Sequence, residues 1–200
     1  MSHTYNKTLI HIISPITLTH CILPMTPAIN LAKKLKLNYQ IHEYEHDPNH
    51  PSFGLEAAEK MGVEPARVFK TLVASDDNGK LAVAVLPVEH LLNLKKLAKA
   101  LGYKKMSMAD PKLVERTTGY VLGGVSPLGQ KKRLPTVIDA SAQAFDTIFC
   151  SGGRRGLEIE QPRTGEDAQM GGEGGRRNGE PRGDVGSAQA LRPDAHEQAE

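Results

Sequence analysis

Residues 117–129 read TTGYVLGGVSPLG, and the rest of the chain is best interpreted outward from this stretch. It holds four glycines, one proline and small hydroxylated residues between short apolar runs. Glycine permits positive φ angles and lets backbone N–H groups approach a ligand closely. The pattern therefore predicts a cradle for an anion or a developing oxyanion. The alternative is a bulged hairpin whose glycines serve turn geometry alone. The basic run QKKR at 130–133 follows at once and favours a phosphate-bearing substrate.

Composition narrows the classes of function. The 200 residues allow one domain with a sizeable core plus tails. Because the formal net charge is only +2, contact with nucleic acid must come from local clusters of cations. Tryptophan is absent and aromatic residues make up 4%, which argues against stacking platforms for single strands. Cys21 and Cys150 lack metal-ligand spacing, so they predict neither a disulfide framework nor a zinc site and suit a reducing cytoplasm.

The composition changes sharply at Met25 and again after Glu160. Residues 1–24 are too short and too interrupted for a transmembrane helix and lack the basic start of a signal peptide. We expect them to lie outside the fold, as an upstream extension with Met25 as the natural initiator. Residues 161–200 are rich in Gly, Arg, Glu and Gln, which predicts disorder and is compatible with a frameshifted tail. The folded domain is therefore expected over residues 25–160.

Capping residues and hydrophobic periodicity predict the elements of this domain. Helices are expected to begin at Thr26–Pro27, Ser52, Asn93 and Asp110–Pro111, where a capping side chain precedes an amphipathic pattern. Strands are expected over residues 39–44, 68–74, 80–86, 104–108, 136–139, 147–150 and 157–160. Asp76–Gly79 predicts a hairpin, and Ser151–Gly156 predicts a second glycine-rich, basic turn.

Three features of these elements allow both a structural and a functional interpretation. His42, His46 and His50 lie four residues apart, but prolines and the strand pattern disfavour a shared metal-binding face. Lys70 is a cation inside an apolar strand, which fits either an edge lysine with a buried stem or a lysine at the end of a pocket. Phe53, at the start of a predicted helix, is typical of a hydrophobic staple or core aromatic.

Several segments taken together resemble one family. They are residues 25–28 (MTPA), 69–72 (FKTL), 108–111 (MADP), 118–120 (TGY), 123–133 (GGVSPLGQKKR) and 151–157 (SGGRRGL). Over residues 25–160 the chain is similar to the YbaK/prolyl-tRNA synthetase-associated editing-domain family. The resemblance implies an α+β fold with a mixed, mostly antiparallel, β-barrel-like sheet and surrounding helices. It also implies a cytoplasmic trans-editing aminoacyl-tRNA deacylase that clears Cys from Cys-tRNA(Pro), with Cys-tRNA(Cys) as a further candidate substrate. The implied partner is prolyl-tRNA synthetase, with no cofactor, metal, membrane or DNA.

The same resemblance implies roles for individual residues. Lys70 matches the pocket lysine near the terminal adenosine and the ester, and Gly123 would supply backbone donors near the scissile ester. Glu158 falls where relatives often carry Asp, so it keeps the charge with one more methylene. The matching substrate-binding positions are Tyr44, Phe53, Thr71, Gly124, Ser126, Pro127, Ser151 and Glu158, and the basic run that would meet the tRNA backbone is Lys131, Lys132 and Arg133.

The sequence shows no Ser-His-Asp or Cys-His constellation, and Cys150 has no evident base. The resemblance implies that the thiol of the substrate attacks its own ester and leaves a cyclic thiolactone, while the protein supplies orientation and an oxyanion pocket. Two alternatives stay open. One is an editing deacylase of the Ala-tRNA(Pro) type. The other is a non-catalytic module that binds tRNA or a synthetase through Lys95, Lys96, Lys99 and the basic run.

Overall fold

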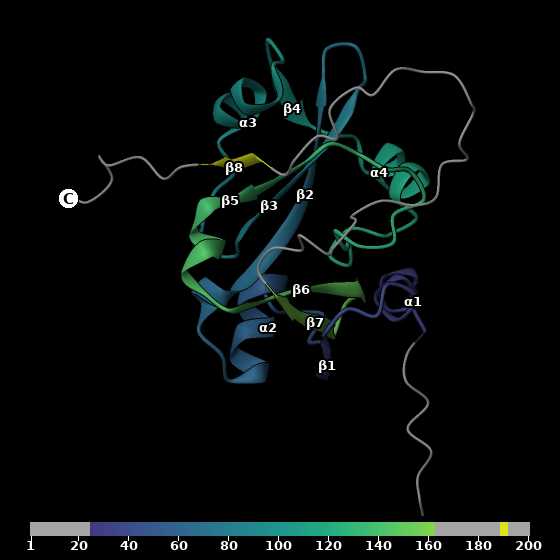
Figure 1. The fold of residues 1–200 in the computed structure, drawn as a ribbon, viewed down its shortest axis with the longest axis vertical. Helices are drawn as coiled ribbons and strands as arrows, with labels where there is room; N and C mark the ends of the chain where they lie inside the picture. The colour runs from purple at the N-terminus through teal and green to yellow at the C-terminus, as the bar shows by residue number, and fades with distance from the viewer. Residues whose placement is uncertain (1–24, 163–188, 192–200) are drawn as a thin grey trace, which may run out of the picture.

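A computed structural model of the chain describes residues 25–162 and 189–191 (Figure 1). In order, the elements are α1 (Pro27–Lys34), β1 (Gln40–Glu43), α2 (Phe53–Met61), the 3₁₀ turn η1 (Pro65–Arg67), β2 (Val68–Asp76), β3 (Leu81–Pro87), α3 (Leu94–Leu101), β4 (Met106–Met108), α4 (Pro111–Thr118), β5 (Thr136–Asp139), the 3₁₀ turn η2 (Ala140–Ala144), β6 (Thr147–Arg154), β7 (Leu157–Pro162) and β8 (Gln189–Leu191). The predicted extension at residues 1–24 lies outside the described residues. None of the described helices is long and apolar enough to cross a membrane.

The α-helices begin at the predicted caps. Each capping side chain accepts a hydrogen bond from the N–H three residues further on, which satisfies one of the free donors at a helix start. These caps are Thr26, Ser52, Asn93 and Asp110. Gly62, Gly102 and Gly119 end α2, α3 and α4 in the left-handed conformation that favours glycine. The predicted helix positions are therefore confirmed.

The strands form one mixed sheet in the order β1-β7-β6-β2-β3-β5-β8, and β4 pairs with β2. The pairs β1–β7, β6–β7, β2–β3 and β2–β4 are antiparallel, whereas β2–β6, β3–β5 and β5–β8 are parallel. The α+β class and the mixed sheet are confirmed. The barrel-like description is too strong, because the described sheet ends at β1 and β8 and does not close.

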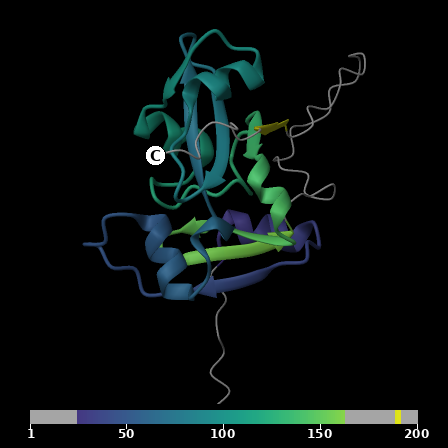
Figure 2. The same ribbon diagram turned by 90° about the vertical axis from the view of Figure 1, so that its left-hand side faces the viewer.

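Strand β2 connects the two parts of this sheet. Its first residues pair with β6, and its last residues pair with β4 along the same edge. In Figures 1 and 2, β6 and β7 run across the direction of β2 and β3, with α2 on the outer side of β6 and β7. The sheet therefore bends where the long strand passes from one partner to the next.

The glycine-rich loop is part of the core. Residues 119–135 connect α4 to β5, and the loop contributes Tyr120, Val125 and Leu128 to the largest apolar cluster. The Tyr120 hydroxyl donates to the Leu128 carbonyl oxygen at 2.8 Å and so closes the loop on itself. The hairpin alternative is wrong, because a helix and not a strand precedes this loop.

Several predicted strand limits differ from the structure by one or two residues, and the larger differences lie near the C-terminal end of the fold. β6 continues through the Ser-Gly-Gly segment to Arg154, which was expected to be a turn, with a register shift between Ser151 and Arg154. β7 extends to Pro162 instead of ending at Glu160. Residues 189–191, inside the predicted disordered tail, form β8 beside β5. Pairing with neighbouring strands sets these limits, and a local sequence pattern carries no such information.

Thr26 joins α1 to β6 and gives a test of this packing. Its hydroxyl accepts the Ile29 N–H at 3.2 Å and donates to the Gly152 carbonyl oxygen, and the side chain is buried. We expect Thr26→Ala to lower the free energy of unfolding by about 1–2 kcal/mol, because it removes a cap and leaves a buried carbonyl unpaired. Urea unfolding measures the change. Thr26→Ser is the matched control and should keep most of the stability; equal losses in both variants would contradict the role of the hydroxyl.

Candidate active site

A cavity lies at the break between the two partners of β2. The ladder to β6 stops at Phe69, and the ladder to β4 begins at Ala74. The Val73 carbonyl oxygen accepts the Ala109 N–H on this edge, and backbone groups alternate sides along a strand. The N–H and C=O of Thr71 therefore face the break. This part of β2 presents an unpaired strand edge to the cavity.

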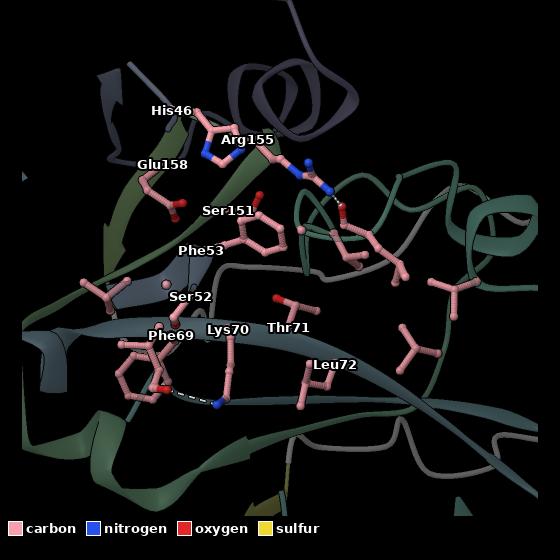
Figure 3. A pocket seen from close by; sticks show the side chains of 18 of the residues that line it. His46, Ser52, Phe53, Phe69, Lys70, Thr71, Leu72, Ser151, Arg155 and Glu158 are labelled. Carbon is pink, nitrogen blue, oxygen red and sulfur yellow. Dashed lines mark hydrogen bonds between the residues drawn. The ribbon is translucent and has the colours of Figure 1, made fainter. Parts of the chain in front are cut away.

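The cavity has a volume of about 310 Å³ and collects side chains that are far apart in the sequence (Figure 3). Its walls come from the segment after β1, the start of α2, β2, the glycine-rich loop, and the β6–β7 hairpin. The predicted site residues that the structure brings together here are Tyr44, Phe53, Lys70, Thr71, Gly123, Ser151 and Glu158.

Three other predicted site residues lie behind the cavity wall. Gly124, Ser126 and Pro127 are buried in the loop and do not line the cavity. The Gly124 N–H donates to the Val121 carbonyl oxygen, and a Cβ at Gly124 would lie 2.9 Å from the Arg154 backbone. The Ser126 hydroxyl accepts the Leu128 N–H at 3.2 Å. These residues shape the loop, and in this structure none of them is placed to touch a ligand in the cavity.

Lys70 borders the cavity, but its ammonium group is turned away from Thr71 (Figure 3). The amine donates to the Val88 carbonyl oxygen at 3.0 Å. The side chain is half-buried, and this burial lowers the pKa of Lys70 from its ordinary value. The lysine is therefore held by one backbone acceptor in a partly desolvated place, which keeps its charge close to the cavity.

The mouth of the cavity is built by Phe53, Arg155 and Gly123. The Arg155 guanidinium lies 4.3 Å from the centre of the Phe53 ring and donates to the Leu122 carbonyl oxygen at 3.1 Å. A Cβ at Gly123 would lie 3.0 Å from the Phe53 ring and 2.8 Å from Arg155 Nε, and the residue has φ +81°. Phe53 is 40% exposed, so it is a rim residue and not a core aromatic, which was one of the two structural interpretations of its position. Sequence reasoning missed Arg155, which appeared only as part of a basic turn.

Glu158 is the buried acid of the cavity. It lies on β7 opposite Ser151 of β6 and His42 of β1, and 9% of the residue is exposed. Burial raises the pKa of Glu158 from 4.5 to about 8. At neutral pH this carboxyl group is therefore mostly protonated and can donate a hydrogen bond, which a carboxylate cannot do.

The three spaced histidines each meet a different glutamate. His42 Nε2 is 3.1 Å from Glu160, His46 Nδ1 is 2.7 Å from Glu56 Oε2, and His50 Nε2 is 3.5 Å from Glu59. Among the described residues no group of three potential ligands is placed to hold a metal ion. Of the three rings, His46 alone lines the cavity. The four-residue spacing brought a metal site into question, which the prolines and the strand pattern disfavoured. The spacing gave no signal for a pairing with Glu56.

Glu56 is fully buried yet ionised. Burial by itself would raise the pKa of Glu56, but hydrogen bonds from the Asp47 N–H and the His46 ring, with the nearby charge of His46 and His50, hold it below its ordinary value. The carboxylate accepts the Asp47 N–H through Oε1 and the His46 ring through Oε2. Both oxygens are thus fixed in direction.

The predicted tRNA-binding run lies outside the cavity. Lys131, Lys132 and Arg133 are exposed. The N–H groups of Lys131 and Lys132 donate to the carbonyl oxygens of Thr118 and Thr117 at the end of α4. The backbone of the run is therefore held while its cationic side chains stay in solvent.

The hydroxyl groups of the cavity are not paired with a base. The Ser52 hydroxyl caps α2, the Ser151 hydroxyl accepts the Gly153 N–H at 3.3 Å, and the buried Thr71 hydroxyl has no partner among the described residues. Cys150 is buried behind the wall, where burial and the nearby Glu158 raise the pKa of its thiol. In the described part of the chain, the cavity contains no nucleophile of the Ser-His or Cys-His type.

The comparison with known families decides the identity of this fold. Residues 50–160 match the family model described as the aminoacyl-tRNA editing domain. The chain belongs to this family. The expected activity class, editing of aminoacyl-tRNA, is thereby confirmed, and the cavity is the candidate active site of an editing domain.

Individual relatives agree with this assignment. The editing domain is 42% identical over 135 residues to EbsC of Enterococcus faecalis, provisionally named a Cys-tRNA(Pro)/Cys-tRNA(Cys) deacylase; the match covers 68% of this chain and 82% of EbsC. The chain is also 29% identical over 125 residues to a proline–tRNA ligase of Trichlorobacter lovleyi. This match covers 62% of the chain and 22% of that enzyme. A crystal structure described provisionally as a trans-editing enzyme for prolyl-tRNA synthetase shares the fold, with a TM-score of 0.61, 21% identity, and coverage of 70% of this chain and 88% of that one.

The raised pKa of Glu158 predicts a pH-dependent stability of the editing domain. Between pH 4.5 and about 8 the unfolded chain loses this proton while the folded protein keeps it. The unfolded state then binds fewer protons, so stability falls as pH rises through this window. We expect the melting temperature of the wild type to fall relative to Glu158→Gln between pH 5 and about 8. Glu160→Gln is the control. Hydrogen bonds to Glu160 outweigh burial and lower its pKa, so this substitution should change the pH dependence of stability only on the acid side of the window. Parallel curves for wild type and Glu158→Gln would contradict this assignment.

Proposed function

We propose that this editing domain is a trans-acting deacylase that clears cysteine from Cys-tRNA(Pro), with Cys-tRNA(Cys) as a second substrate. The similarity to EbsC supports the substrate class, since 82% of that protein is covered at 42% identity. The observation that carries the reaction is a mostly apolar cavity with a few polar groups on its wall and, among the described residues, no activated protein nucleophile. Such a site suits a substrate that brings its own nucleophile, and the thiol of a cysteinyl ester is one.

The cavity offers a distinct role to each of its polar groups. The unpaired strand edge and hydroxyl of Thr71 bind the aminoacyl group, because a buried polar group gains most from a ligand that satisfies it. Gly123, on the wall beside Phe53, brings a backbone N–H toward the oxyanion, and Lys70 adds a positive charge nearby. The protonated Glu158 donates to a ligand oxygen, and Tyr44 and Ser151 complete the wall.

The surface around the cavity suits the rest of the tRNA. Lys131, Lys132 and Arg133 are exposed on a loop whose backbone is held by α4, so they are placed for phosphate contacts. The likeness to part of a proline–tRNA ligase supports prolyl-tRNA synthetase as the partner that produces the mischarged tRNA. This assignment places the protein in the cytoplasm, where translation occurs.

A panel of charged tRNAs tests the function. Release of amino acid is measured from Cys-tRNA(Pro), Cys-tRNA(Cys), Ala-tRNA(Pro), Ser-tRNA(Pro) and Pro-tRNA(Pro) under single-turnover conditions. We expect the two cysteinyl substrates to be cleared fastest. Preference for Ala-tRNA(Pro) would assign the alanine-editing alternative. Saturable binding without release of amino acid would assign a non-catalytic tRNA-binding module.

The substrate thiol is expected to matter more than any protein nucleophile. An internal nucleophile in good geometry supplies about 7–11 kcal/mol of the barrier, and a thiol with pKa about 8.5 is ionised far more than a hydroxyl near neutrality. Cys-tRNA(Pro) should therefore be cleared at least about a hundred-fold faster than Ser-tRNA(Pro), with a thiolactone trapped early in the reaction. Cys150→Ala should leave the rate near that of the wild type. Equal rates on the two substrates would overturn the thiol mechanism but not the editing function.

Lys70 is expected to act on the reaction and little on folding. Lys70→Met keeps the apolar stem and removes the charge that lies beside the cavity. We expect kcat/KM for Cys-tRNA(Pro) to fall by about 10²-fold or more, comparable with the loss of one oxyanion donor, while the melting temperature stays close to that of the wild type. Lys80→Met, on the exposed β2–β3 turn, is the matched control. A large loss of stability with an unchanged rate would show that Lys70 is a structural strand residue.

A further inference from the structure

One buried nitrogen of the cavity has no structural use. His46 Nε2 is buried and without a hydrogen-bond partner among the described residues. A buried polar atom left unpaired costs free energy, so most such atoms in folded proteins are satisfied. The Thr71 hydroxyl, on another wall of the same cavity, is also unpaired. Two unsatisfied polar atoms around one cavity indicate a polar ligand that pairs with both.

The other ring nitrogen sets the protonation of this one. His46 Nδ1 lies 2.7 Å from Glu56 Oε2, and a carboxylate can only accept. Nδ1 therefore carries the hydrogen, and in the neutral ring the lone pair is on Nε2. The second Glu56 oxygen is held by the Asp47 N–H, and α2 itself is capped by Ser52. The pair is thus rigid before any substrate arrives.

His42 and His50 show what a structural histidine looks like in this fold. His42 uses Nε2 for Glu160, on the far side of the cavity wall. His50 uses Nδ1 for the backbone of Ser52 and Nε2 for Glu59. His46 has the same kind of glutamate partner, but its remaining nitrogen meets no hydrogen-bonding group in the described part of the chain.

We propose that His46 is the general base of this editing domain and that Glu56 is the residue that positions it. The inference rests on the proposed deacylase function and adds a protein base to it. His46 Nε2 takes the proton of the substrate thiol as sulfur forms a bond to the ester carbon, and the carbonyl π pair moves to oxygen. The carbonyl then re-forms, the bond to the ribose oxygen breaks, and His46 returns the proton to that oxygen. The products are a thiolactone and a tRNA with a free hydroxyl, and His46 is neutral again.

Phe53 lies beside the His46 ring at the rim of the cavity. The two ring centres are 5.5 Å apart, and the Arg155 guanidinium packs on the Phe53 ring. Geometry around a catalytic base is often completed only when the substrate binds.

Several charged groups act on His46 from the surrounding elements. Glu56 of α2 contacts the ring at Nδ1, and the charges of His46 and His50 help to lower the pKa of Glu56. Arg155 of the β6–β7 turn packs on the same Phe53 ring, and Lys70 of β2, Tyr44 after β1 and Glu158 of β7 line the same cavity. Because Glu158 titrates near pH 8, the rate profile is most informative below about pH 7.5.

The decisive variant is His46→Asn. Asparagine places an amide N–H where Nδ1 lies, so the bond to Glu56 is kept while Nε2 is removed. We expect kcat/KM on Cys-tRNA(Pro) to fall by about 10²–10⁴-fold, the usual contribution of a general base. His46→Gln, which offers a non-basic amide near the position of Nε2, should fall similarly. His42→Gln is the matched control and should keep the activity of the wild type.

The pH dependence separates a base from a structural ring. In a window from about pH 5.5 to 7.5, below the ionisation of the thiol near 8.5, log kcat/KM of the wild type should not follow the unit slope of the thiolate fraction, because His46 takes the proton of the un-ionised thiol. For His46→Asn it should rise with unit slope across the window, because the thiol must then ionise unaided. Glu56→Gln removes the carboxylate that fixes the hydrogen on Nδ1, so kcat/KM should fall while the profile stays unlike that of His46→Asn.

Each outcome decides one of the two proposals. A wild type that releases no cysteine from any charged tRNA overturns the proposed function. A wild type that is active, with His46→Asn equal to it in rate and pH profile, overturns the general base alone. If the His46 variants do not fold, the wild-type profile still decides, since a unit slope throughout the window would overturn the proposal.

Discussion

The structure depends on how one edge of strand β2 is shared. A strand edge can pair with only one neighbour at each residue. β6 pairs with the start of this edge in the parallel direction, and β4 pairs with its end in the antiparallel direction. On this edge the backbone around Thr71 has no strand partner among the described residues, although its other edge pairs with β3, and the cavity lies there. An interruption of the sheet ladder, normally a liability, is thus the feature that creates the site.

The elements around this break have packing roles that also shape the cavity. The glycine-rich loop is anchored in the core by Tyr120 and Leu128, and Gly123 lets it come into contact with Phe53. Gly54, at the start of α2, faces Val88 so closely that a Cβ there would overlap its side chain. Close backbone approach at these two glycines brings α2 and the loop to the same opening. Core packing and site geometry are therefore set by the same contacts.

Two buried glutamates near the cavity are held in opposite states of protonation. Glu56 receives hydrogen bonds at both oxygens and stays charged, whereas burial raises the pKa of Glu158 to about 8 and keeps it mostly neutral. At Glu56, hydrogen-bond donors outweigh the effect of burial and lower the pKa. At Glu158, burial dominates and raises it. Carboxyl groups with separated pKa values are a common device for dividing acid and base tasks within one active site. Here the charged one directs His46 and the neutral one is left with a proton to donate.

The sequence by itself determined the helices, most strands, the hairpin at Asp76–Gly79 and, through its resemblance to a family, much of the cavity wall. Capping and periodicity are local, so Thr26, Ser52, Asn93 and Asp110 could be located without a fold. Tertiary structure alone decided that the sheet stays open, that Ser126 supports the loop instead of facing the cavity, and that Phe53 lies at the rim. It also decided that His46 meets Glu56. His46 and Glu56 are ten positions apart in the sequence, with a proline-containing loop between them. The packing of α2 against the sheet sets the distance and orientation of the two side chains.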